Sequence, residues 1–183
     1  MKNKTPDFAY HMTKFFTEYL PIQRNLSPNS IATYRDTFRL LLLFYDTEKH
    51  IKPNLLTLDM LNVQQIEDFM LWLKKERNCG ASTCNQRLGA LKSFFRYLQF
   101  ALPDCALQCQ ENLAIRPMKQ PEPGLKYLTI DGIKLLLEQP DIKTKYGRRD
   151  LAILSLMYDT GARVQEIADI KIVHIRFSAP ATI

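Results

Sequence analysis

The residues of this sequence best suited to chemistry are an arginine and a glutamate at the start of a predicted helix. Residues 161–166 read GARVQE; Gly161 ends one helical pattern and Arg163 falls in the first turn of the next. An arginine there joins a two-pronged cation to the free N–H groups at the helix start, which makes an anion site. Glu166 lies on the same face and could hold the guanidinium. The alternative is an ordinary surface ion pair, worth a few tenths of a kcal/mol.

A second set of candidates consists of cations and small polar residues on two predicted helices of the first half. They are Thr33, Arg35, Arg39, Ser82, Thr83, Asn85, Gln86, Arg87, Lys92 and Arg96. Polar side chains at a helix N-terminus can read base edges in the major groove of DNA, and cations behind them can hold phosphates. The alternative is a capped helix whose polar face is only solvated.

Four helices are predicted to position these first-half candidates as a bundle. The predicted ranges are 8–20, ended by Pro21, then 28–45, 62–80 and 82–100. Ser27 before Pro28 is a cap followed by proline at the first helical position. Residues 62–65, NVQQ, fit a capping box.

The segment 116–124 divides the chain, because it holds three prolines and a glycine and so predicts a linker. Beyond it, Thr129 caps a helix that stops at Pro140. The almost entirely apolar residues 151–158 predict a buried core helix over 149–158. Alternation in residues 172–183 predicts a strand.

Composition limits the class of protein. The chain has 183 residues, of which 46% are apolar and 24% charged, as in a soluble globular protein. The longest apolar run, residues 40–45, is too short to span a membrane, and no export signal is evident, so a cytoplasmic location is expected. Without an export signal we expect reduced thiols rather than disulfides. No second cysteine or histidine pair lies at a matching distance from Cys105 and Cys109, so we expect no metal. Residues 1–120 carry 16 basic and 11 acidic side chains, most of the net +6.

Blocks of this sequence, in their order along the chain, resemble the tyrosine recombinase (phage integrase) family, whose members cut and rejoin DNA at specific sites. Residues 26–35, LSPNSIATYR, and 82–98, STCNQRLGALKSFFRYL, resemble its DNA-clamping core-binding domain. Residues 149–167, RDLAILSLMYDTGARVQEI, resemble the block that holds its first catalytic arginine. The resemblance implies a mainly α fold: a four-helix SAM-like bundle over 1–115, the proline-rich linker 116–124, and over 125–183 the first part of a mixed α/β catalytic domain.

The resemblance also implies a mechanism. Arg163 matches the arginine that grips the scissile phosphate, and Glu166 matches the acidic residue that supports it. A tyrosine hydroxyl attacks the phosphodiester and leaves a 3′-phosphotyrosyl link and a free 5′-hydroxyl, and another strand's hydroxyl reverses the step. No metal or nucleotide cofactor is implied. The implied partners are double-stranded DNA and other recombinase subunits in a synaptic tetramer.

The sequence departs from the family pattern after the arginine block. The family's hairpin lysine, His-x-x-Arg motif and nucleophilic tyrosine are expected there, but His174 is followed by Arg176 two residues on, and Lys171 precedes the expected hairpin. None of the eight tyrosines matches the nucleophile, since Tyr158 precedes Arg163. The sequence therefore predicts a C-terminally truncated recombinase that binds DNA without cleaving it.

Two other classes of function remain open. A DNA-binding regulator without a catalytic role would lose nothing on Arg163→Ala. A helical protein-interaction module would keep all its properties on Arg87→Ala or Lys92→Ala, because its basic face would only be solvated.

Overall fold

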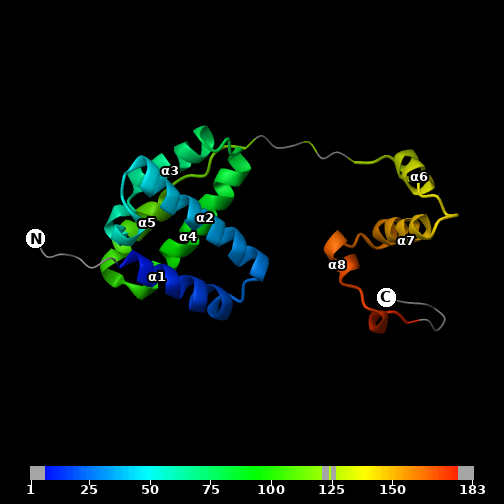
Figure 1. The fold of residues 1–183 in the computed structure, drawn as a ribbon, viewed down its shortest axis with the longest axis horizontal. Helices are drawn as coiled ribbons and strands as arrows, with labels where there is room; N and C mark the ends of the chain where they lie inside the picture. Colours follow the sequence, from blue (N-terminus) through cyan, green and yellow to red (C-terminus); the bar gives the residue numbers. More distant parts are fainter. Residues whose placement is uncertain (1–6, 121–123, 125–126, 177–183) are drawn as a thin grey trace, which may run out of the picture. The chain divides into compact units, whose positions relative to one another are not determined.

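The computed structural model describes residues 7–120, 124 and 127–176 of the chain. It divides into two compact units, Met1–Glu122 and Pro123–Ile183, whose boundary falls within the proline-rich segment 116–124. The first unit is a helical bundle, and the second is a smaller group of helices (Figure 1).

Three of the predicted helices of the first unit are present. They are α2 (Pro28–Glu48), α3 (Val63–Lys75) and α4 (Ala81–Ala101). α3 ends at Lys75 rather than at Gly80, and the capping box predicted at 62–65 is only half formed, because Gln65 Oε1 has no hydrogen-bond partner among the described residues. The Ser27 hydroxyl accepts the Ser30 N–H at 3.3 Å, and the Asn62 side chain accepts the Gln65 N–H at 3.1 Å. These short polar side chains satisfy backbone donors that have no partner inside the helix.

The prediction that Pro21 ends the first helix is wrong. α1 (Phe8–Lys14) continues without a break into η1 (Phe15–Gln23), a π-type helix that contains Pro21. The Arg24 N–H reaches back five residues to the Tyr19 carbonyl at 2.9 Å, as π winding requires. This wider winding relieves the clash that a proline ring makes with the preceding turn of an α-helix.

A bundle of only four helices is also a wrong prediction, because α5 (Ala106–Ala114) follows α4. The connections between these helices also contain short 3₁₀ turns. Two lie between α2 and α3, η2 (Pro53–Leu55) and η3 (Leu58–Met60), and one lies between α4 and α5, η4 (Pro103–Cys105). α4 is the central helix and contacts η1, α2, α3 and α5 (Figure 1). α5 is only nine residues long, which is shorter than the stretch over which helical periodicity can be recognised in a sequence.

The bundle is held together largely by aromatic side chains. Phe15 and Phe94 lie 5.2 Å apart between ring centroids, and Phe38 lies 5.2 Å from Phe94. All three are at most 2% exposed, so η1, α2 and α4 meet at one buried cluster. Burying a side chain of this size stabilises a fold by about 1.5–3 kcal/mol, so this cluster fixes how the helices that carry the basic residues are arranged.

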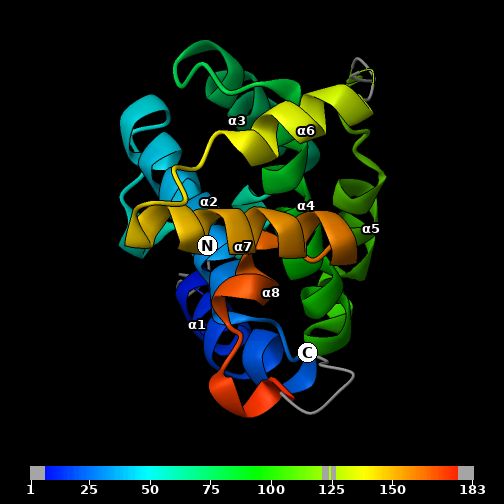
Figure 2. The same cartoon turned by 90° about the vertical axis from the view of Figure 1, so that its right-hand side faces the viewer.

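The second unit contains α6 (Ile130–Glu138), α7 (Lys145–Thr160), α8 (Val164–Ala168) and the 3₁₀ turn η5 (Ile172–His174). The predicted cap is confirmed, because the Thr129 hydroxyl accepts the Gly132 N–H at 3.1 Å. α7 lies beside both α6 and α8, as the second view also shows (Figure 2).

Two predictions for the second unit fail in the part that the structure describes. The helix expected over 149–158 is not a buried core helix, since Ile153 is 37% exposed and Tyr158 is 55% exposed. It lacks a core because, in its own unit, it packs against only a few short helices. Residues 172–174 of the predicted strand form a 3₁₀ turn instead, and residues 177–183 lie outside the described residues. The mainly helical fold class is confirmed, and its mixed α/β part is not seen there.

Candidate nucleic-acid interface and phosphate-binding arginine

Arg163 stands at the junction of α7 and α8. Gly161 ends α7 in the left-handed conformation (φ +65°), and its N–H donates to the Met157 carbonyl at 2.9 Å. This tight ending turns the chain within two residues, so that Arg163 becomes the N-cap position of α8. The glycine break predicted from the sequence therefore sets the place of the arginine.

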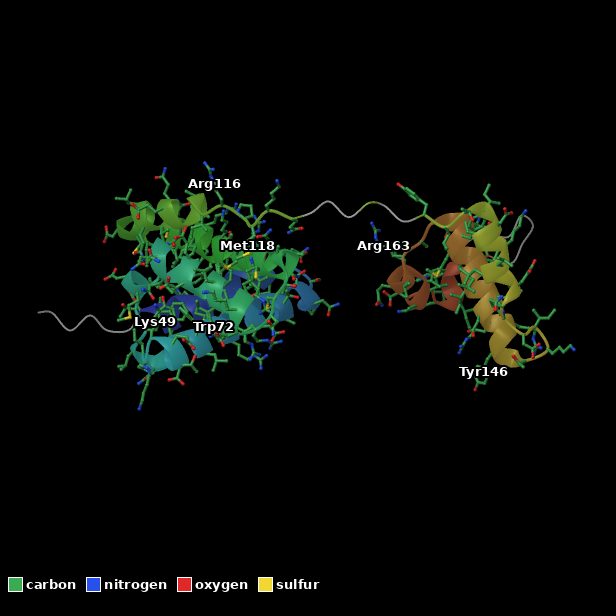
Figure 3. All side chains as sticks on the ribbon, turned by 90° about the horizontal axis from the view of Figure 1, so that it is seen from above. Lys49, Trp72, Arg116, Met118, Tyr146 and Arg163 are labelled. Atoms are coloured by element: carbon green, nitrogen blue, oxygen red, sulfur yellow. The ribbon has the colours of Figure 1, made fainter. Side chains whose placement is uncertain are left out.

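Glu166 holds Arg163 in two places. One carboxylate oxygen accepts the Arg163 backbone N–H at 2.7 Å, and the other accepts Nη1 of the guanidinium at 3.0 Å. The Arg163 side chain is nevertheless 84% exposed, and it projects away from the helices of its own unit (Figure 3). One carboxylate thus orients the guanidinium, whose other N–H donors can still bind an anionic oxygen.

The arginines predicted on α2 lie on its surface. Arg35 and Arg39 are both exposed, and Nε of Arg39 lies 3.8 Å from the Asp36 carboxylate. Thr33 is half-buried, and its hydroxyl donates to the Asn29 carbonyl within the helix at 3.0 Å. α2 therefore offers two cations, while the Thr33 hydroxyl is engaged by its own helix.

On α4 the predicted residues divide into two groups. Ser82, Gln86 and Arg96 are exposed, and Thr83 and Arg87 are half-buried. The remaining pair, Asn85 and Lys92, turn toward the segment that follows α5.

Asn85 and Lys92 make hydrogen bonds that sequence reasoning did not foresee. The Asn85 side chain donates to the Met118 carbonyl at 2.8 Å and accepts the Met118 N–H at 2.7 Å. The Lys92 ammonium donates to the Ile115 carbonyl at 2.6 Å. Burial, with a smaller contribution from Arg96, lowers the pKa of Lys92. The acceptors lie 23 and 33 residues away along the chain, beyond the reach of any local pattern.

Among the described residues the cysteines form no disulfide. Cys84 and Cys109 are buried, and burial raises the pKa of the Cys109 thiol to about 11. A thiol with so high a pKa is protonated near neutral pH and is a poor nucleophile. Among the described residues, no group of histidine, cysteine and carboxylate side chains could hold a metal ion, and no helix is long and apolar enough to cross a membrane.

Comparison with known proteins gives the class to which this bundle belongs. Residues 14–100, from the end of α1 to the last turn of α4, match the family described as phage integrase, N-terminal SAM-like domain. Residues 14–100 therefore form a phage integrase N-terminal SAM-like domain, and the chain is similar to tyrosine recombinases.

Individual relatives extend this match past the bundle. The chain is 36% identical over 168 residues to the integrase/recombinase y4rC of Sinorhizobium fredii, covering 92% of this chain and 51% of the relative. It is 30% identical over 156 residues to the tyrosine recombinase XerD of Listeria innocua, covering 85% and 50%. The chain thus spans about half the length of the curated relatives it matches. No solved structure matches it.

Proposed function

We propose that this chain binds double-stranded DNA through α2 and α4, as the DNA-clamping part of a site-specific tyrosine recombinase. The observation that carries the proposal is the exposure of Arg35, Arg39 and Arg96 on two helices of a domain related to integrases. Guanidinium groups held on a rigid helical frame bind phosphates by paired hydrogen bonds. Gln86 and Ser82, exposed at the start of α4, would contact base edges.

Alanine substitution tests this interface. Arg35→Ala, Arg39→Ala and Arg96→Ala should each weaken the binding of a fluorescent duplex, measured by anisotropy at low salt, by several-fold. Lys74→Ala is the control, because Lys74 is an exposed cation at the end of α3, a helix that carries none of the proposed contacts. Equal loss in all four variants would mean that only net charge matters. No binding by the wild-type chain would favour the alternative of a protein-interaction module.

We propose that Arg163 contacts the scissile phosphate in DNA recombination and that Glu166 orients it. The support is the geometry: a carboxylate fixes the backbone and one guanidinium nitrogen, and the side chain stays open to solvent. Such a cation would stabilise charge that develops on the phosphoryl oxygens, as preorganised donors do in comparable reactions. Because no tyrosine of this chain matches the family's nucleophile, we expect binding without cleavage.

A nicked suicide substrate tests that expectation. Incubated with the chain, it should give no covalent protein–DNA adduct on a denaturing gel. An adduct that depends on one of the eight tyrosines would contradict the proposal. We also propose, as expected from the sequence, that the chain acts in the cytoplasm together with other recombinase subunits.

A further inference from the structure

The segment that leaves α5 is bound to the side of α4. We call residues 115–118 the strap. Both of its ends are held: the Ile115 carbonyl accepts the Lys92 ammonium at 2.6 Å, and the backbone of Met118 makes a two-way pair with the Asn85 side chain, at 2.7 and 2.8 Å. Three hydrogen bonds therefore join the strap to one helix.

The spacing of these bonds shows how the strap runs. From Asn85 to Lys92 a helix rises by about 10.5 Å, at roughly 1.5 Å per residue. From Ile115 to Met118 an extended chain covers about 10 Å, at roughly 3.3 Å per residue. The two lengths match, so the strap runs antiparallel to α4. One end of the strap is bound by Asn85 and the other end by Lys92.

Apolar contacts accompany the hydrogen bonds. Ile115 is 8% exposed and belongs to the bundle core, and Met118 packs against that core. Leu88 of α4 and Met70 of α3 line the same groove as these two strap residues. Arg116, between the anchors, is exposed, and its side chain points outward (Figure 3). The strap thus turns Ile115 and Met118 toward the bundle, while Arg116 and Pro117 are exposed.

We propose that Asn85 and Lys92 form a docking site for the strap and so fix the point at which the chain leaves the bundle. Both side chains are positioning residues, because the amide of Asn85 uses its donor and its acceptor on Met118, and the ammonium of Lys92 is directed to a carbonyl. Residues 116–118 of the predicted linker therefore belong to the bundle. This inference does not rest on DNA binding, since every contact lies within the free chain.

Hydrogen exchange at the Met118 amide tests the proposal in the free protein. Asn85→Ala removes the acceptor of that amide and leaves the Met118 carbonyl without its donor, so exchange there should rise by about 5- to 100-fold. Lys92→Met keeps the aliphatic stem and removes the ammonium, and it should speed exchange at Met118 in the same direction. Gln86→Ala, an exposed neighbour on α4, is the matched control and should change nothing.

Exchange at a core amide of α2, that of Leu41, separates docking from general stability. If the strap alone is released, Leu41 exchange stays at the wild-type rate while Met118 exchange rises. Equal increases at both amides would make Asn85 a general stability residue and would overturn the proposal, as would unchanged Met118 exchange. Should Asn85→Ala fail to fold, Lys92→Met decides by the same two amides.

Discussion

Asn112 provides the sharpest test of how α5 is attached to the bundle. Its side chain is fully buried, and its Nδ2 donates to the Leu61 carbonyl at 2.7 Å and to the Gln108 carbonyl at 3.0 Å. The first bond joins α5 to the loop before α3, 51 residues away in the chain. Asn112→Ala removes both bonds and leaves the Leu61 carbonyl without this donor.

The size of the effect follows from burial. An orphaned buried carbonyl costs about 1–3 kcal/mol, and the small cavity adds to it. Oδ1 of Asn112 has no hydrogen-bond partner among the described residues, so its removal offsets part of this cost, and we expect Asn112→Ala to lower the free energy of unfolding by about 1–2 kcal/mol. For a unit of this size that corresponds to a fall in Tm of roughly 5 °C or more.

A neighbouring glutamine supplies the control. The Gln108 side chain donates to the Leu58 carbonyl at 2.8 Å, but Gln108 is only half-buried, so water can replace it. Gln108→Ala should therefore cost less than about 1 kcal/mol in urea unfolding followed by circular dichroism. If the two variants lose the same stability, the Leu61 carbonyl is satisfied by water and the reasoning is refuted.

Further predictions concern single positions. Burial, opposed by Asp7 and assisted by Lys14, lowers the pKa of His11, so the folded state binds fewer protons than the unfolded state. Stability should therefore be fully present above pH of about 6.5 and fall as the pH drops below it. The free energy of unfolding, measured by urea denaturation, should therefore differ less between pH 7.5 and pH 5 in His11→Gln than in the wild-type chain. Gly161→Ala places a β-carbon on a left-handed backbone and should lower the stability by about 1 kcal/mol. Gly161→Asn should lower it less, and thermal unfolding of the two variants measures the difference.

Local signals in the sequence identified several side chains that act on their own backbone, although the Thr144 cap, which starts α7 four residues before the predicted 149, was missed. Ser27, Asn62 and Thr129 were identified as caps or starts, because a cap bonds to an N–H only three residues away. Glu166 was placed against Arg163 by the same short spacing. Helical periodicity gave α2, α3 and α4 because each has a strong apolar stripe.

The sequence could not predict what depends on distant partners. Pro21 stays inside a helix because that segment has π-helical winding, and the same segment is held in the core by the buried Phe15 and Leu20. Asn85 and Lys92 were assigned to DNA because their type and helix position suit it, while the backbone they bind lies 33 and 23 residues away. Burial of residues 149–158 was inferred from composition, which says nothing about how many helices are present to cover them.

The salt dependence of DNA binding tests the central claim most directly. If Arg35, Arg39 and Arg96 each contact a phosphate, the logarithm of the association constant should fall with the logarithm of salt concentration with a slope of about −3 or steeper. Replacing all three by alanine should make the slope shallower by nearly that amount, and the Lys74→Ala control should leave it unchanged. A slope near zero, or one unaltered in the triple variant, would contradict the account.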